Sequence, residues 1–290
     1  MHLFIGKELS NEERLKSLEE EFNTLKEKLP FLDSFVTVAP ISLENEKIYH
    51  DARSAAFFAM GRTMKEKTTV GLALPGAYLA STYTAITEAW FQKVNVVVFA
   101  FYDKLSEVST AWIDRCIVKS MTIGADEIDD SIDEIESCCG MNGPVLINIV
   151  GVKDDETSFD YRKWIDAIRQ KEGNAKIRCY NAIQSDGIIN IPSKDKYGVI
   201  SKYIGMSVAV NVGYLLCTSE CFLIDANVFR TRYANGNMKI ILFDDGNLEK
   251  IDAKSWIAGN GWWCEVVSKD ETTAVNWLIE DKTQGVLIVR

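Results

Sequence analysis

The sequence predicts an α/β protein made of two domains, each a mainly parallel β-sheet with helices on both faces. Strand and helix patterns alternate along most of its 290 residues. The strands are runs of β-branched and aromatic residues with few polar interruptions, as at residues 94–101. Such runs are typical of parallel strands buried on both faces. The helices between them are expected to cover those two faces.

The stretch from residue 49 to 101 shows this order most clearly. It predicts a helix, a strand, a glycine turn, a second helix and a second strand at residues 53–64, 69–74, 75–76, 77–91 and 94–101. The crossover between the strands is expected to be right-handed. Because open parallel sheets bind ligands at the C-terminal ends of their strands, Pro75, Gly76 and Ala77 lie where a ligand could sit.

Residues 9–29 are expected to form a charged amphipathic helix. Ser10 and Glu13 have the spacing of a capping box, and leucine and phenylalanine recur at helical spacing up to Pro30. This stripe fits either a helix laid on the body of the protein or a coiled-coil contact with a partner. It is too short for sustained heptads, which favours the first interpretation.

The rest of the first half predicts a strand, two helices, a short strand-like pair and a buried strand. The first strand is expected at residues 35–38, the helices at 107–116 and 126–136, the strand-like pair after Ser120 and the buried strand at 143–149. Residues 126–136 are dense in carboxylates, but they lack the glycine of a calcium loop and keep isoleucines at helical spacing. A solvated helix face is therefore expected there.

A polar segment with a helix at residues 161–170 separates two similar halves. The predicted organisation is an N-terminal helix at residues 1–30, a first domain at 31–150, a linker at 151–176 and a second domain at 177–290. The second domain predicts strands at residues 177–183, 214–217, 238–243, 261–266 and 285–289. Its helices are expected at residues 200–212, 222–233, 252–259 and 271–279.

Composition excludes several classes of function. The net charge of −10 argues against nucleic-acid binding, because no cluster of lysine and arginine faces phosphate. No apolar run is long enough to span a membrane. Seven cysteines, an odd number scattered through apolar segments, predict reduced thiols and a cytoplasmic location. With only His2 and His50 and no paired cysteine spacing, zinc is not expected.

The first half resembles the pyrimidine-binding domain of thiamine-diphosphate enzymes. The resemblance rests on Asp51-Ala52-Arg53, the alanine-phenylalanine helix that follows, the turn at Pro75-Gly76-Ala77, the helix end at Glu88-Ala89 and the strand that begins Gly143-Pro144-Val145. Within that family the likeness is greatest to the menaquinone-pathway synthases that join 2-oxoglutarate to isochorismate. That branch has Asp-Glu-Arg at the helix start and Ser-Gly-Thr at the turn.

The resemblance implies that the second half corresponds to the diphosphate-binding domain, with no middle domain between the two. The positions that would hold magnesium and diphosphate are Ser219-Glu220 and Asp244-Asp245, where the family has Gly-Asp and Asn-Asn. Three carboxylates facing an anionic diphosphate repel it, unless a divalent cation offsets part of the charge. Solvated strand ends, a metal site of Glu220, Asp244 and Asp245 without thiamine, and weak thiamine binding all remain open.

Ala52 stands where the family has the glutamate that activates the cofactor. Alanine can neither donate, accept nor exchange a proton. The sequence therefore predicts a pseudoenzyme, a regulatory or structural subunit with no catalytic residue and no cofactor. A divergent 2-oxo acid decarboxylase or carboligase, which would need thiamine diphosphate and magnesium, is the enzyme alternative. A third possible function is the binding of another small molecule in the cleft that holds the cofactor in the family.

The resemblance also implies assembly, because the family's cofactor lies between two subunits. A homodimer, or a heterodimer with an active homologue, is expected to pair through helix faces built from small residues. Candidate segments are residues 55–60, 76–84 and 204–213. If these faces were exposed in a monomer, they would form apolar patches of the kind that normally mark interfaces.

Overall fold

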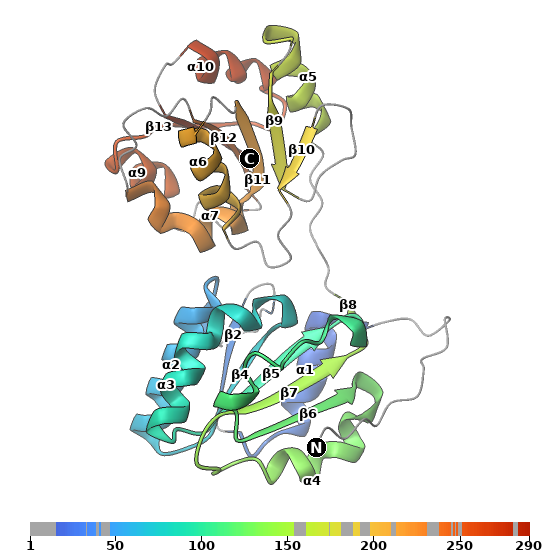
Figure 1. Ribbon diagram of the computed structural model, residues 1–290. Helices are drawn as coiled ribbons and strands as arrows, with labels where there is room; N and C mark the ends of the chain where they lie inside the picture. Colours follow the sequence, from blue (N-terminus) through green and yellow to red (C-terminus); the bar gives the residue numbers. More distant parts are fainter. Residues whose placement is uncertain are drawn as a thin grey trace. The chain divides into compact units, whose positions relative to one another are not determined.

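The computed structural model of the chain describes most of the sequence: residues 16–32, 34–38, 41, 47–153, 161–173, 175–180, 188–191, 198–209, 213–230, 238–244, 246, 248, 251–280 and 284–290. The chain divides into two compact units, Met1–Glu156 and Thr157–Arg290 (Figure 1). Each unit is built on its own sheet, and every strand pair in both sheets is parallel. The predicted fold class is therefore confirmed.

The first unit contains a six-stranded sheet of order β3-β2-β4-β5-β7-β6. Its strands are β2 (Ser34–Val38), β3 (Lys47–Tyr49), β4 (Val70–Pro75), β5 (Val96–Tyr102), β6 (Lys119–Gly124) and β7 (Val145–Val150). A separate short parallel pair joins β1 (Lys16–Ser17), which precedes these strands in the sequence, to β8 (Val152–Lys153), which follows them. The central strands β4 and β5 are buried along their whole length, as their apolar sequences predict.

Helices cover both faces of this first sheet. On one face, α1 (Leu18–Lys28) and α4 (Ile128–Glu136) place Phe22 and Ile135 in a core with alternate residues of β5 and β7. On the other face lie α2 (Ala52–Glu66) and α3 (Tyr83–Gln92), which contact each other side by side (Figure 1). The N-terminal helix is thus part of the core, which agrees with a helix laid on the body.

The second unit repeats the architecture. Its six-stranded sheet has the order β10-β9-β11-β12-β14-β13. The strands are β9 (Ile177–Tyr180), β10 (Ile188–Ile191), β11 (Tyr214–Thr218), β12 (Lys239–Phe243), β13 (Trp263–Val267) and β14 (Gly285–Val289). Numbered from its own first strand, each sheet has the order second, first, third, fourth, sixth, fifth. The two units therefore share one topology.

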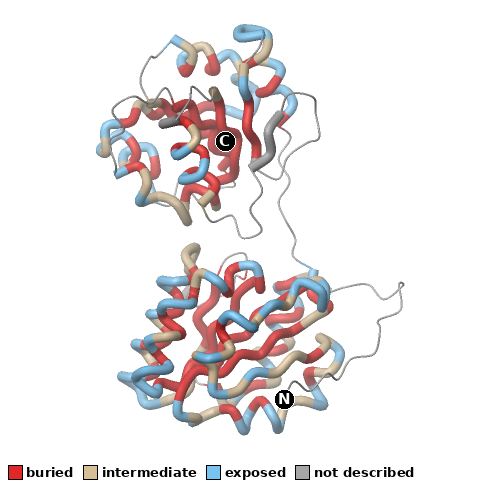
Figure 2. The backbone as a smooth tube through the Cα atoms, in the orientation of Figure 1, coloured by how far each residue is buried: buried red, intermediate tan, exposed pale blue. Residues whose placement is uncertain are grey.

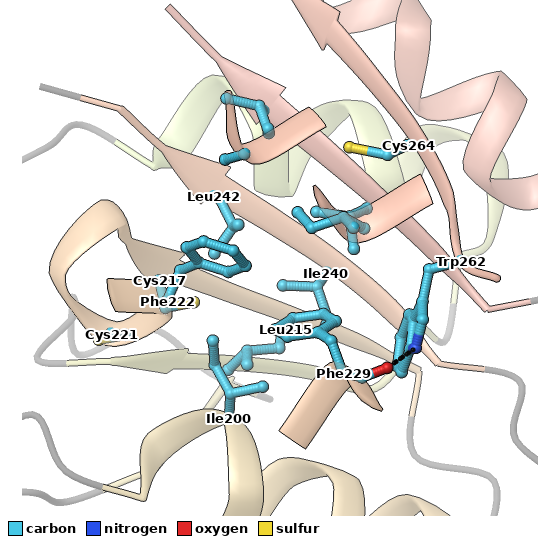
Figure 3. Close-up of a cluster of buried hydrophobic side chains, with 14 of the residues drawn as sticks. Ile200, Leu215, Cys217, Cys221, Phe222, Phe229, Ile240, Leu242, Trp262 and Cys264 are labelled. Atoms are coloured by element: carbon cyan, nitrogen blue, oxygen red, sulfur yellow. Dashed lines mark hydrogen bonds between the residues drawn. The ribbon is translucent and has the colours of Figure 1, made fainter. Parts of the chain in front are cut away.

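Helices also cover both faces of the second sheet. One face carries α6 (Val199–Ala209), α7 (Ser219–Asp225) and α9 (Ala253–Gly259), and the other carries α5 (Arg162–Lys171) and α10 (Val275–Glu280). Figure 3 shows the first of these cores, where the Trp262 indole Nε1 donates a hydrogen bond to the Phe229 carbonyl oxygen at 3.2 Å. The α5 helix, which the sequence assigned to the linker, packs on this second sheet. In each unit the strands run through the most buried part (Figure 2).

Three helix predictions were wrong in their extent. The first helix does not run from residue 9, because Lys16–Ser17 is extended and α1 begins at Leu18. Its capping box is Ser17 with Glu20, each accepting from the other's backbone N–H at 3.3 and 3.1 Å. Ser10 and Glu13 lie outside the described residues. The same four-residue pattern therefore occurs twice, and only the later copy can be located.

The segments after β4 and β11 also differ from prediction. Residues 76–82 form a 3₁₀ helix, η1 (Gly76–Thr82), before α3 begins, and the Thr82 hydroxyl donates to the Leu79 carbonyl at 2.7 Å. In the second unit α7 begins at Ser219, directly after the strand, and gives way to a 3₁₀ helix, η5 (Ala226–Arg230). Ser219 and Glu220 are therefore in the first helical turn instead of at the end of the strand.

The predicted helix at residues 107–116 was wrong. Two short 3₁₀ turns, η2 (Leu105–Glu107) and η3 (Asp114–Cys116), stand there instead. Local hydrogen bonds to two backbone carbonyls close turns in this segment instead of continuing a helix. The Ser109 carbonyl accepts from the Trp112 indole at 2.7 Å, and the Thr110 carbonyl accepts from the Ile113 amide at 2.8 Å. Further 3₁₀ turns, η4 (Ala125–Glu127) and η6 (Thr272–Ala274), precede α4 and α10.

Candidate functional site

The start of α2 contains the position that the resemblance assigns to a catalytic glutamate. Asp51 is the N-cap of the helix: its Oδ1 accepts from the Arg53 amide at 3.1 Å and its Oδ2 from the Ser54 hydroxyl at 2.6 Å. Ala52, the first helical residue, is fully buried. The helix start therefore presents a buried methyl group, and the neighbouring carboxylate is engaged in capping the helix.

The turn after β4 is packed tightly by a side chain from the next strand. Pro75 ends β4, and Gly76 is buried at the start of η1, whereas Ala77 is exposed. A Cβ atom added to Gly76 would overlap the ring of Tyr102, the last residue of β5. Tyr102 is 6% exposed, and burial, with a smaller contribution from the Glu107 carboxylate, raises the pKa of its hydroxyl to about 12. The space beside this glycine, where a ligand was expected, holds the neutral Tyr102 ring.

We expect Gly76→Ala to lower the free energy of unfolding of the first unit by about 1–3 kcal/mol, because the new methyl group must displace a buried ring. Urea denaturation of the full chain measures this loss. Gly173→Ala is the control, since none of the described residues has an atom within 4 Å of the added methyl group. In a Tyr102→Ala background the same Gly76 substitution should cost clearly less. Equal costs in both backgrounds would contradict the tight contact.

The corresponding turn of the second unit follows β11. Thr218 pairs with Phe243 of β12, as Pro75 pairs with Phe101 of β5 in the first unit, so Ser219 occupies the place of Gly76. Ser219 is fully buried and Glu220 is half-buried, both in the first turn of α7. The serine side chain thus stands where the family has a glycine that lets phosphate approach the backbone.

Asp244, directly after β12, is occupied by hydrogen bonds within its own unit. Its Oδ1 accepts from the Gly246 and Leu248 amides, each at 3.0 Å, and its Oδ2 accepts from Arg290 Nε at 3.1 Å. The carboxylate is fully buried, whereas the Arg290 side chain is 34% exposed. These contacts hold the loop after β12 to the end of β14. They are the contacts of a structural carboxylate.

The predicted metal ligands are only partly brought together. Glu220 is in the first turn of α7 after β11, and Asp244 follows the paired strand β12, so both lie near the same end of the second sheet. Asp245 lies outside the described residues. Among the residues that the structure does describe, no group of three or more His, Cys, Asp or Glu side chains could hold a metal ion. The assignment of Glu220, Asp244 and Asp245 to a metal therefore stays a prediction.

Of the three segments that were expected to form an interface, residues 55–60 bury their small side chains inside the first unit, whereas Ala77 and Ala80 of residues 76–84 and Gly205 of residues 204–213 are exposed. Ala55, Ala56, Ala59 and Met60 are at most 5% exposed, because α2 uses them to pack on the sheet. Large apolar side chains line the outer side of α2 and α3 instead, where Figure 2 marks exposed positions. They are Phe57, Met64, Tyr83, Trp90 and Phe91, with exposures of 44, 51, 41, 40 and 69%. Below, these five residues are called the outer apolar face.

Sequence reasoning missed two residues that shape these turns, Tyr102 and Arg290. Tyr102 ends a strand that was predicted, but nothing in the sequence indicates that its ring lies on Gly76. Arg290 is 46 residues from Asp244, and only the pairing of β12 with β14 brings the two together. The sequence could have indicated them only by position, since Tyr102 and Arg290 each come directly after a predicted buried strand.

Comparisons with known proteins assign no family to the chain. No protein-family model matches the sequence, and no curated protein matches it. Among solved structures, benzoylformate decarboxylase from Polynucleobacter necessarius aligns with 94% of this chain and 98% of its own, at 9% identity and a TM-score of 0.39. A likeness this low leaves the function to be argued from the residues. Within the described part of the chain, no helix is long and apolar enough to cross a membrane.

Proposed function

We propose that the chain is a two-domain protein of the thiamine-diphosphate-enzyme type that has lost thiamine catalysis and acts as a regulatory or structural subunit. The observation that carries this proposal is Ala52. The position of the family's glutamate holds a buried methyl group. The adjacent Asp51 carboxylate caps α2 through Oδ1, which accepts from the Arg53 amide, and its Oδ2 accepts from the Ser54 hydroxyl. The Ala52 side chain cannot take up or release a proton for a cofactor.

The described residues fit thiamine diphosphate and magnesium poorly. Tyr102 fills the space beside Gly76, and Ser219 adds a side chain at the equivalent turn of the second unit. Asp244 already accepts two backbone hydrogen bonds and one from Arg290, so binding a metal would break contacts that hold its loop. We therefore propose that the protein works without this cofactor and without magnesium.

The proposed role requires a partner. The outer apolar face supports assembly, because exposed apolar patches normally mark interaction surfaces. We propose a homodimer, with a heterodimer with an active homologue as the outcome if the chain alone is monomeric. The odd number of cysteines supports a reducing location, for which the cytoplasm is proposed.

Thermal denaturation with added cofactor tests this proposal. Millimolar thiamine diphosphate with magnesium is expected to change the melting temperature of the full chain little, since a ligand stabilises only as far as its concentration exceeds its dissociation constant. A concentration-dependent rise that disappears in Glu220→Ala, but persists in the exposed control Glu271→Ala, would overturn it. That result would favour the divergent 2-oxo acid decarboxylase or carboligase.

A further inference from the structure

Two lysines at one end of the first unit have a backbone conformation that lysine rarely adopts. Lys67 and Lys93 are the C-caps of α2 and α3, and their φ angles are 56° and 57°. Only one other described residue besides glycine, Asp252, has a positive φ. Glycine is the usual residue at a left-handed C-cap, because a side chain with a Cβ atom is strained there. The chain therefore keeps a lysine side chain at both positions although glycine would be more stable.

The two lysines are neighbours in space. Lys67 stands three residues before β4 and Lys93 three residues before β5, and the first residues of these two parallel strands are paired. Between the lysines and the paired residues, the Thr69 hydroxyl donates to Asn95 Oδ1 at 2.8 Å. Both lysines are exposed. Because like charges held side by side repel each other, the arrangement is most favourable when an anion lies against it.

Large apolar side chains are exposed at the same two helix ends. Met64 is in the last turn of α2, and Trp90 and Phe91 are in the last turn of α3. Their exposures are 51, 40 and 69%, and the centroids of the two rings are 5.0 Å apart. Phe91 is more exposed than any other large apolar side chain among the described residues. These three residues, with Lys67 and Lys93, are called the basic-aromatic end.

The acidic side chains of these two helix ends are engaged within the unit. Glu66 pairs with Arg62, one turn earlier in α2, at 2.8 Å. On α3, Glu88 Oε1 accepts a hydrogen bond from the Gln92 side-chain amide. Lys65 is a third exposed lysine in the last turn of α2. The two helix ends therefore present a positive charge on a chain whose net charge is −10.

We propose that the basic-aromatic end binds the surface of a membrane that contains anionic phospholipids. Its lysines contact lipid phosphates, and Trp90, Phe91 and Met64 enter the boundary between headgroups and acyl chains. Such a contact needs no membrane-spanning helix. The cytoplasmic leaflet carries anionic lipids, which agrees with the proposed location. Phe57 and Tyr83, nearer the other ends of the same helices, remain for the proposed assembly.

A lipid surface fits these side chains better than a nucleic acid does. A nucleic acid is bound along its backbone by a groove or row of cations, whereas Lys65, Lys67 and Lys93 are gathered at one point. Binding of a protein surface to a membrane depends on buried apolar area together with attraction to anionic lipids. The basic-aromatic end offers both contributions.

Glycine substitution removes each lysine charge while it relieves the backbone strain. Lys67→Gly and Lys93→Gly should therefore keep or raise the melting temperature, and each should weaken binding to anionic vesicles about fivefold. Phe91→Ser should weaken that binding about tenfold. The double variant with arginine at positions 67 and 93 keeps both charges and should bind like the unmodified chain. Lys171→Gln removes an exposed lysine at the end of α5 and is the control.

Co-sedimentation of the full chain with phosphatidylcholine vesicles, with or without phosphatidylglycerol, measures the binding. The expected result is binding that requires phosphatidylglycerol, falls as salt is added and is weakened in both glycine variants but not in the arginine or Lys171 variants. No binding to the anionic vesicles, or equal binding by the glycine variants, would overturn the proposal. Binding to a single-stranded oligonucleotide without binding to vesicles would also overturn it and would favour a nucleic acid as the partner.

Discussion

Replacement of Asp244 by alanine is expected to lower the free energy of unfolding of the second unit by about 3 kcal/mol. The loss removes a buried carboxylate and leaves the Gly246 and Leu248 amides and the Arg290 guanidinium without this acceptor. Asp244→Asn should lower the free energy of unfolding by less. The asparagine amide oxygen can still accept hydrogen bonds from the Gly246 and Leu248 amides, although the negative charge beside Arg290 is lost. Urea denaturation, with hydrogen exchange to separate the two units, measures both changes.

Asp270→Ala is the control for this experiment. Asp270 pairs with Lys163 at 2.9 Å, but its side chain is 95% exposed, so its removal should change stability little. If Asp244→Ala left stability unchanged and instead removed magnesium binding, the structural role of Asp244 would be wrong. The metal-site interpretation would then be favoured.

Replacement of Asn95 by alanine is expected to have an effect at least as large, about 3–4 kcal/mol on the first unit. Asn95 is 7% exposed. Its Nδ2 donates to the Cys138 and Gly143 carbonyls at 3.2 and 2.9 Å, and its Oδ1 accepts from the Thr69 hydroxyl and the Gly140 amide, both at 2.8 Å. Alanine leaves the Cys138 and Gly143 carbonyls and the Thr69 hydroxyl without this partner, whereas the exposed Gly140 amide keeps its hydrogen bond to Thr69 Oγ1 at 3.2 Å.

Two further variants sharpen the test of this network. Asn95→Asp keeps the acceptor but sets a carboxylate against two carbonyl oxygens, so it should also be strongly destabilising. Asn260→Ala, which removes a single hydrogen bond to the Trp256 carbonyl, should cost about 1 kcal/mol or less. An aspartate variant as stable as the unmodified protein would contradict the importance of the two donated bonds.

The elements predicted well are those whose sequence alone decides their environment. β5 and β7 are uninterrupted apolar runs, and central parallel strands have no polar face to mask the pattern. The edge strand β6, Lys119–Gly124, was recognised only as a short pair, because at an edge it keeps polar and half-exposed residues. The predicted helix at residues 107–116 was wrong, and the segment instead closes short turns on the backbone carbonyls of Ser109 and Thr110.

The sequence named candidate site residues but not the side chains that contact them. The rule that ligands bind at strand ends pointed to Gly76, and the resemblance pointed to Ser219 and Asp244. Two of these turns are occupied by contacts from distant residues. Tyr102 fills the first, and Arg290 holds the carboxylate at the second. Such contacts depend on strand pairing across tens of residues. The sequence therefore left open whether Asp244 was a ligand or a structural residue.

Isothermal titration calorimetry of the full chain with thiamine diphosphate and magnesium tests the central claim most directly. Ala52, the Tyr102 ring beside Gly76 and the engaged Asp244 carboxylate together predict no saturable heat of binding up to millimolar cofactor. Saturable one-site binding with a dissociation constant in the micromolar range or below would contradict the claim that this chain has lost its thiamine site.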